Sequence, residues 1–266
     1  MKTQKNNLSA LILCGGKGTR MGSVGLFVPK VCLLAFDQPL ILRQIKQAFS
    51  AGIDNIILST NETSFSFIKK LLQTELNAKN LKRINLIRNP WHDHSSMKGL
   101  LFALNLLETD RIIISFGDIY FKVNPFLGIK RFTYSSKSFI GGVIPKQKNE
   151  LLKGGVIDAN QSGRVLRISL GALIKFNKGY RWNGLVIMSK NVHKPLIAKF
   201  VRTAKADIPE EDYYDYYRKV TQDFEVFESS DFINVNNPDD LLLASSLRLK
   251  EIGNKNIPYI FKNKEN

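Results

Sequence analysis

The sequence predicts an α/β protein, a three-layer α/β/α sandwich around a mixed, mostly parallel central sheet. Over the first 120 residues, short apolar runs of strand length alternate with segments of helical periodicity. An order of strand, helix, strand and helix indicates parallel strands joined by right-handed crossovers, with helices on both faces. Beyond that point, short strand-like runs follow one another, separated by Gly, Asn and Ser. Such runs indicate strands that complete the same sheet.

Four apolar runs in the first half have the length of buried strands. They are Leu8–Cys14, Asn55–Thr60, Arg83–Ile87 and Arg111–Gly117. Three segments between them carry apolar residues at helical spacing, and these are Leu40–Ala51, Phe65–Leu76 and Met97–Leu107. Gly52 marks the expected end of the first helix, because glycine commonly follows the last helical residue.

The second half has strand-like pieces at Ser138–Pro145, Gly155–Asp158, Val165–Ile168 and Asn183–Ser189. Two helices are expected next, at Val192–Val201 and Pro209–Val220, and the charges at both ends of the second suit the helix dipole. A last strand, Phe232–Val235, precedes a final helix from Asn237 to Lys250. Because no linker or internal repeat interrupts the chain, we expect one domain over residues 1–266.

The composition indicates a globular protein without membrane insertion. Hydrophobic residues make up 44% of the 266 residues and charged residues 23%, which is ordinary for a soluble domain. No apolar run approaches the roughly 20 residues of a membrane-spanning helix. The run Leu11–Cys14 is too short for a signal peptide. Two cysteines, Cys14 and Cys32, provide neither a disulfide framework nor a zinc site, so we expect a cytoplasmic protein.

The charge balance favours anionic partners. Lys and Arg number 39 against 23 Asp and Glu, which gives a net charge of +16. Nucleic acid, a membrane surface and phosphorylated metabolites would all suit this charge. The basic residues are scattered, however, and no recognition motif accompanies them. We therefore expect small phosphorylated partners and no nucleic acid.

A glycine-rich segment directly follows the first predicted strand. Gly15, Gly16 and Gly18 allow successive N–H groups to face one point, as in sites that hold phosphate oxygens. Thr19 adds a hydroxyl, and Arg20 and Lys30 add positive charge. Neither the P-loop motif nor the dinucleotide motif fits this spacing. Because ligands of such sheets bind at the carboxyl ends of the parallel strands, this loop is the first candidate site.

A second strand end carries a carboxylate. Asp118 follows Gly117 at the end of the run Arg111–Gly117. An aspartate in this place suits a magnesium ion held on substrate phosphates. An aspartate that only caps a turn is the alternative, but the shared sheet edge with the glycine-rich loop favours the metal.

These motifs resemble those of a known family, the nucleotidyltransferases that act on sugar phosphates and related phosphates. The segment from Gly15 to Gly22 followed by Pro29-Lys30 is similar to their signature, and Asp118 looks like their metal-binding Asp. Phe232–Leu241 is similar to their closing strand and helix, and Asn89–Met97 to the base-side loop of the molybdenum-cofactor branch. The resemblance covers roughly residues 8–121 and 182–250 and implies a Rossmann-like nucleotidyltransferase fold. It assigns the nucleotide to residues 8–121 and the acceptor to residues 122–250.

Carried over by position, the resemblance implies a role for each matching residue. Lys30 and Arg20 would be catalytic, Lys30 between the α-phosphate and the incoming phosphate and Arg20 on the β and γ oxygens. Asp118 would bind Mg²⁺ together with Asn234 or Asn236, where the family usually has Asp. Nucleotide contacts are implied for Leu13, Gly15, Gly16, Gly18, Thr19, Ser95, Ser96 and Gly117. Acceptor contacts are implied for Trp182, Asn183 and Gly184.

The chemistry agrees with these roles. Attack of a phosphate on the α-phosphorus of a nucleoside triphosphate needs positioning and charge neutralisation rather than a nucleophilic side chain. The chain has three histidines and no triad-like grouping. We therefore expect a Mg²⁺-dependent enzyme that transfers a nucleoside monophosphate to a phosphorylated acceptor, first of all a sugar 1-phosphate, and releases pyrophosphate.

Three other interpretations are compatible with parts of the sequence. One is a CTP-dependent cytidylyltransferase that acts on a phospho-alcohol or another small phosphate that is not a sugar. A catalytically inactive nucleotide-binding regulator is the second, although it would have no reason to keep Lys30, Arg20 and Asp118. A nucleotide-sugar glycosyltransferase is the third, but it would show Asp-x-Asp where this strand ends in Asp118-Ile119-Tyr120. The sequence leaves open the base, the acceptor and whether the chain forms a homo-oligomer.

Overall fold

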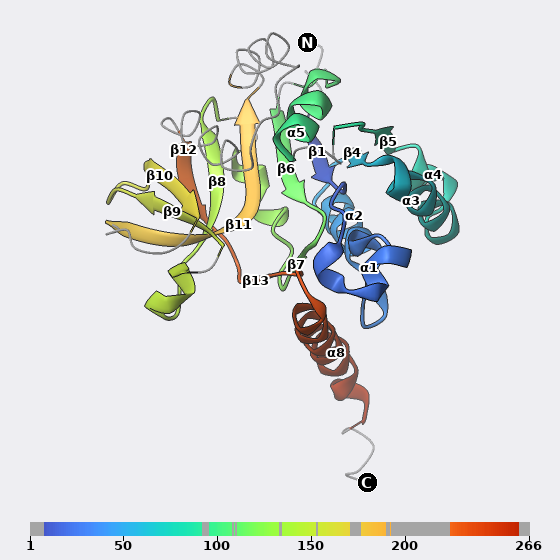
Figure 1. Cartoon of the computed structure of the whole chain (residues 1–266). Coiled ribbons are helices and arrows are strands. Elements are labelled where there is room, and N and C mark those ends of the chain that lie inside the picture. The colour runs from blue at the N-terminus through green and yellow to red at the C-terminus, as the bar shows by residue number, and fades with distance from the viewer. Residues whose placement is uncertain are drawn as a thin grey trace.

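The computed structural model describes residues 8–91, 96–107, 109, 111–132, 135–152, 154–170, 177–189, 192 and 224–260. A nine-stranded sheet runs through these residues (Figure 1). Its main path is β10 (Val165–Leu170), β9 (Gly155–Ala159), β11 (Lys178–Ser189), β6 (Arg111–Phe116), β1 (Leu8–Leu13), β4 (Asn55–Thr60) and β5 (Ile84–Arg88). Beside this path, β8 (Ser138–Val143) pairs with β11, and β12 (Phe224–Glu228) pairs with β8.

The two halves of the sheet differ in strand direction. In the N-terminal half, β6, β1, β4 and β5 are parallel, with Ile12 of β1 opposite Leu58 and Ser115. In the C-terminal half, β11 is antiparallel to β6, β8 and β9. The parallel register brings the carboxyl ends of β1 and β6 to one edge, where both candidate motifs begin.

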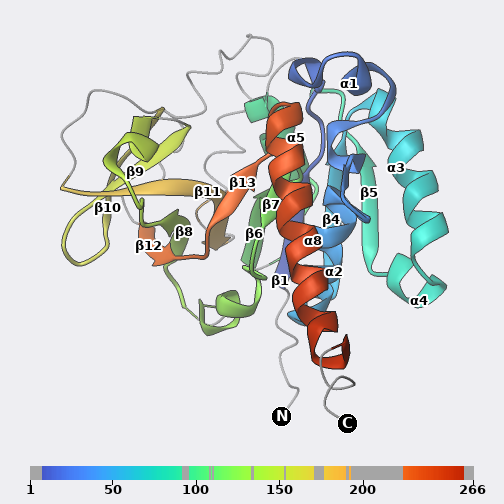
Figure 2. The same ribbon diagram turned by 90° about the horizontal axis from the view of Figure 1, so that it is seen from below.

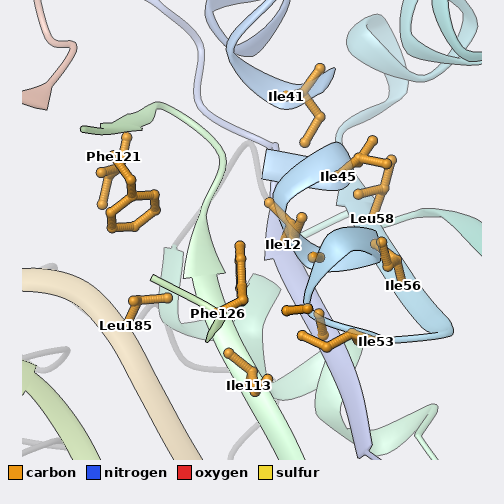
Figure 3. Close-up of a cluster of buried hydrophobic side chains, with 14 of the residues drawn as sticks. Ile12, Ile41, Ile45, Ile53, Ile56, Leu58, Ile113, Phe121, Phe126 and Leu185 are labelled. Carbon is orange, nitrogen blue, oxygen red and sulfur yellow. The ribbon is translucent and has the colours of Figure 1, made fainter. Parts of the chain in front are cut away.

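Helices cover both faces of the parallel half. Alternate residues of a strand point to opposite faces, and Ile12 packs with α2 (Leu40–Ser50) and α3 (Glu62–Glu75). Figure 3 shows Ile41 and Ile45 of α2 facing this cluster. Leu11 and Leu13 pack on the other face, with α5 (Ser96–Asn105). These layers confirm the predicted α/β/α sandwich.

A second, smaller sheet joins distant parts of the chain. β7 (Ile119–Phe121) follows β6 and pairs antiparallel with β13 (Phe232–Asn234). The final helix α8 (Pro238–Ile260) comes next and lies beside α2, as the turned view in Figure 2 shows. It also contacts the hairpin of β2 (Leu34–Ala35) and β3 (Gln38–Pro39).

Charged side chains fix α8 to the body of the protein. Arg43 of α2 binds both carboxylate oxygens of Glu251 over 3.0 and 2.9 Å and also donates to the Phe121 carbonyl oxygen over 2.8 Å. The Tyr120 hydroxyl donates to Glu251 over 2.8 Å. Arg248 binds Asp37 of the hairpin through two nitrogens, at 2.7 and 3.0 Å. Paired Arg–carboxylate bonds of this kind set orientation as well as adding energy.

Short helical turns complete the chain. They are η1 (Thr19–Met21), α1 (Ser23–Phe27), η2 (Lys30–Cys32), α4 (Ala78–Leu81), η3 (Leu127–Phe132) and η4 (Lys148–Leu152). None of the helices in the described part of the chain is long and apolar enough to span a membrane.

The predicted elements differ from the structure mainly at their ends. α3 begins at Glu62 rather than Phe65, because Asn61 caps it by accepting from the Ser64 N–H. β11 begins at Lys178, five residues before the predicted Asn183, and α8 continues ten residues past Lys250. β7, β12 and the short helical turns were not predicted. The predicted helices at 192–201 and 209–220 lie outside the described residues, apart from residue 192.

Candidate active site

The ends of β1 and β6 meet at a single glycine. The Gly117 N–H donates to the Leu13 carbonyl oxygen over 2.9 Å. A Cβ atom at Gly117 would lie 3.0 Å from Val31 Cγ1, 3.1 Å from the Leu13 oxygen and 3.2 Å from Cys14 Sγ. These separations are shorter than ordinary contacts between heavy atoms. Glycine therefore allows the turn after β6 to approach the end of β1 closely.

An ion pair lies beside this contact. The Lys30 ammonium group, on η2, pairs with the Asp118 carboxylate. The Lys30 side chain is 10% exposed and the Asp118 side chain 20%, so little water screens the two charges. The geometry brings together the cation and the carboxylate that the sequence placed at neighbouring strand ends.

The glycine-rich loop packs against the same lysine. Gly18 has a φ of 66°, a left-handed conformation that glycine adopts readily, and a Cβ atom there would lie 3.6 Å from Lys30 Cβ. Gly25 comes so close that a Cβ atom on it would overlap the Gly18 carbonyl oxygen. Thr19 and Arg20 are exposed on η1. The loop therefore packs against Lys30, which in turn pairs with Asp118.

The neighbouring strand β4 holds the start of this loop. The Cys14 N–H donates to the Ser59 carbonyl oxygen over 2.7 Å. Asn61 Nδ2 donates to the Gly15 carbonyl oxygen over 3.4 Å, from the residue that also caps α3. Gly16 is exposed, and a Cβ atom on it would meet no atom within 4 Å. Gly16 thus borders open space beside a fixed backbone.

A buried amide supports the turn that carries Asp118. Gln44 Nε2 donates to the Phe116 carbonyl oxygen over 2.8 Å and to the Ile119 carbonyl oxygen over 2.9 Å. Its Oε1 accepts from the Ser115 hydroxyl over 2.9 Å. Gln44 was not predicted as a site residue. The available signal was a polar residue among the apolar positions of α2, whose hydrophobic face lies in the core.

The residue that follows β13 is hydrogen-bonded to the backbone of Asp118. The Val235 N–H donates to the Asp118 carbonyl oxygen over 3.0 Å, and Asn234 pairs with Ile119 in the β7–β13 ladder. Asn234 is exposed and Asn236 half-buried. The Asn236 backbone N–H donates to Asp240 Oδ2 over 2.8 Å, and its side-chain Nδ2 donates to the Asn234 carbonyl oxygen over 3.4 Å. Both candidate asparagines therefore stand in the segment next to Asp118.

Asp118 and the neighbouring asparagines offer oxygen ligands for a metal ion. Within the described ranges, no group of three or more His, Cys, Asp or Glu could hold a metal ion. One carboxylate, with Asn234 and Asn236 in the segment bonded to its backbone, suits Mg²⁺, which keeps waters and binds largely through substrate phosphates.

The segment predicted to contact an acceptor lies in a bulge of β11. The ladder between β11 and β8 shifts register between Trp182 and Val186, and Gly184 has a φ of 77°. Trp182 and Asn183 are buried, with exposures of 7% and 0%. Trp182 Nε1 donates to the Leu185 carbonyl oxygen over 3.3 Å, and Asn183 Oδ1 accepts from the Leu185 N–H over 3.0 Å. These contacts hold the bulge, and an acceptor role for the three residues stays a prediction.

The predicted base-side serines are only partly covered by the structure. Ser95 lies outside the described residues. Ser96 is the first residue of α5, at the start of the helix that packs on the face holding Leu13. Asn89, which directly follows β5, contacts the same helix, since its Nδ2 donates to the Gly99 carbonyl oxygen over 2.6 Å.

The two cysteines are free thiols under the site. Burial raises the pKa of Cys14 well above its ordinary value, and the nearby Cys32 and Asp118 raise it further. Burial also raises the pKa of Cys32, to about 12. Both thiols therefore stay protonated at neutral pH, and a protonated thiol is a poor nucleophile.

The N-terminal part of the chain is similar to a known domain family. Residues 10–127 match the MobA-like NTP transferase domain. This part of the chain is similar to NTP transferase domains. The match covers the glycine-rich loop, Lys30 and Asp118, and it confirms the resemblance that those motifs indicated.

Curated relatives match this chain over a short segment. The mannose-1-phosphate guanylyltransferase catalytic subunit beta of Danio rerio is 35% identical over 71 residues, which are 27% of this chain and 18% of that protein. Mannose-1-phosphate guanylyltransferase 1 of Arabidopsis thaliana is 36% identical over 75 residues, 27% of this chain and 20% of that protein. The matched segment is thus a fifth or less of each relative.

Solved structures match nearly the whole chain. A UDP-glucose pyrophosphorylase complexed with UDP-glucose has a TM-score of 0.73 at 13% identity, over 91% of this chain and 98% of that one. The inositol-1-phosphate CTP transferase from T. maritima has a TM-score of 0.70 at 18% identity, over 90% and 96%. The predicted Rossmann-like nucleotidyltransferase fold is therefore confirmed.

Proposed function

We propose that the protein is a nucleotidyltransferase that transfers a nucleoside monophosphate from an NTP to a phosphorylated acceptor and releases pyrophosphate. The observation that carries this proposal is the Lys30–Asp118 ion pair beneath the glycine-rich loop, where β1 and β6 meet. A lysine that packs against a glycine-rich loop and pairs with a carboxylate suits a reaction between two anions. The match of residues 10–127 to an NTP transferase domain supports the same reaction.

In this reaction an oxygen of the acceptor phosphate attacks the α-phosphorus of the NTP. A new phosphorus–oxygen bond forms, the bond to the β-phosphate breaks, and pyrophosphate leaves with the bonding electrons. The acceptor phosphate is already an anion, so no side chain has to remove a proton. Lys30 would lie between the two reacting phosphates, and Arg20 would neutralise charge on the departing pyrophosphate. Fixed charges of this kind stabilise the transition state strongly.

Asp118 would hold Mg²⁺, with an oxygen of Asn234 or Asn236 and the substrate phosphates as further ligands. When bound, the ion supplies positive charge to the α-phosphate and to pyrophosphate. Lys30 then has to exchange the Asp118 carboxylate for a phosphate oxygen. The ion pair in the structure therefore keeps both groups neutralised until substrate enters.

A sugar 1-phosphate is the acceptor that we propose first. The guanylyltransferase relatives are named for mannose 1-phosphate. Residues 8–121 would hold the nucleotide, through Leu13, the glycine-rich loop, Thr19, Gly117 and the start of α5 near Ser95 and Ser96. Residues 122–250 would hold the acceptor near the bulge of β11. The similarity to an inositol-1-phosphate CTP transferase supports the second candidate, a CTP-dependent enzyme that uses a phospho-alcohol.

A screen of pyrophosphate release tests this function. The four common NTPs are combined with sugar 1-phosphates and phospho-alcohols, with and without Mg²⁺, and Lys30→Ala serves as the inactive control. We expect release in at least one combination, dependent on Mg²⁺ and lost in the control. NTP binding without release in any combination would instead support a nucleotide-binding regulator.

A further inference from the structure

Gln44 joins the two sides of the turn that carries Asp118. This residue lies in α2 and is 0% exposed. Its two N–H groups bind the carbonyl oxygens of Phe116 and Ile119, which are the residues before and after Gly117–Asp118. One side chain from a separate helix thus fixes both ends of a four-residue turn.

The chemistry of an amide explains why glutamine stands here. The chain leaves the main sheet after Phe116 and enters the small sheet at Ile119, so the backbone changes direction inside the protein. Buried carbonyl groups need hydrogen-bond donors at such a change. A glutamine amide offers two donors and one acceptor in a plane. Ser115 donates to that acceptor, which keeps the two N–H groups facing the turn.

We propose that Gln44 is a positioning residue that sets where the Asp118 carboxylate meets the metal and the triphosphate. This inference rests on the proposed function. Lys30 holds the carboxylate from one side, and Gln44 holds the backbone that carries it. This role differs from that of an ordinary core residue. The loss of the Gln44 amide would weaken the magnesium-dependent part of NTP binding and leave the rest of NTP binding unchanged.

The test compares NTP affinity in Mg²⁺ with NTP affinity in EDTA, measured by calorimetry. Gln44→Met keeps the length of the side chain and removes its three hydrogen bonds. Ile45→Ala is the matched control, since Ile45 is buried in the same helix and packs in the core cluster. We expect both variants to melt at a lower temperature. Only Gln44→Met should lose the gain in affinity that Mg²⁺ gives, by about 10–100-fold, as substitutions behind a metal ligand do.

A double variant separates action through Asp118 from a general effect. If Gln44 acts through Asp118, Gln44→Met combined with Asp118→Asn should bind NTP in Mg²⁺ no more weakly than Asp118→Asn alone. Should Gln44→Met fail to fold, Ser115→Ala replaces it. That variant keeps the amide and frees its orientation, so a smaller loss in the same direction is expected.

The outcomes distinguish the two levels of the proposal. Wild-type protein whose NTP affinity does not rise with Mg²⁺ overturns both the proposed function and the role of Gln44. A wild-type rise that Gln44→Met retains in full overturns the role of Gln44 alone and leaves the proposed function standing. Additive losses in the double variant also overturn it.

Discussion

The ends of β1 and β6 carry a pair of charged side chains, and Gly117 allows the two backbones there to approach closely. In the bulge of β11, by contrast, the polar side-chain groups are buried. Lys30 and Asp118 neutralise each other, and in the proposed reaction they would exchange this contact for a phosphate and a metal ion. Trp182 and Asn183 are bonded to the backbone of Leu185. The Lys30–Asp118 pair thus belongs to a region that we propose changes partners in the reaction, whereas the contacts in the bulge of β11 maintain its shape.

The largest expected effect tests the first region. Asp118→Asn should lower kcat by about 100-fold or more, as the loss of a transition-state electrostatic contact does. Asp37→Asn is the matched control, because Asp37 is also paired with a cation but belongs to the hairpin against α8. Steady-state kinetics should show kcat within twofold of wild type for the control. Equal kcat in both variants would remove Asp118 from the proposed site.

The next prediction concerns the shape of the bulge. Gly184→Ala puts a Cβ atom at a φ of 77°, where it would overlap Ile119 Cδ1 and lie 2.7 Å from Phe116 Cδ2. The backbone conformation costs about 1–2 kcal/mol, and the overlap adds about 1–3 kcal/mol. Gly154→Ala is the control, with a φ of 76° and no atom within 4 Å of the new Cβ. In urea unfolding, Gly184→Ala should lose more stability than Gly154→Ala, and equal losses would contradict the packing argument.

Asn183 sharpens the comparison, since it carries both a structural contact and a predicted acceptor contact. Asn183→Ala removes the acceptor for the buried Leu185 N–H and should lower the free energy of unfolding by about 1–3 kcal/mol. If Asn183 also contacts the acceptor, the KM for the acceptor rises while the KM for the NTP stays constant. A variant that is less stable but unchanged in both KM values would make Asn183 a residue of the bulge alone.

The smallest effect concerns a charge pair that only holds the fold. The hydrogen bond from Arg248 lowers the pKa of Asp37. Burial opposes this shift, and the Arg248 charge lowers the pKa further, so that the net direction is downward. A lowered pKa in the folded state means that the pair stabilises the protein above the ordinary Asp pKa, about 3.9, and loses this effect as the pH falls further. Because Asp37 is 43% exposed, the contribution should be about 0.2–1 kcal/mol. The difference in unfolding free energy between wild type and Asp37→Asn in denaturant should therefore be full at pH 6 and should shrink as the pH falls below about 3.9.

The local parts of this architecture could be predicted from the sequence. Apolar runs located the parallel strands, and the glycine cluster with Lys30 and Asp118 located the strand ends, because both signals depend on neighbours along the chain. The β7–β13 pairing joins Ile119 to Asn234, and no local pattern marks such a pair. The hydrogen bonds of the Gln44 side chain could not be predicted either, since their three partners are more than 70 positions away in the sequence. The inward orientation of Trp182 and Asn183 follows from a bulge that only the strand register shows.

The β7–β13 ladder also has a consequence for biosynthesis. Ribosomes add about 5–20 residues per second, and Ile119 pairs with a residue 115 positions later, at Asn234. Asp118 is therefore made roughly 6–23 s before its neighbouring strand exists. During that interval the parallel strands can already associate, while the edge of β7 that pairs with β13 has no partner strand. A nascent chain stalled before residue 232 should accordingly be the form that chaperones retain and that aggregates most readily.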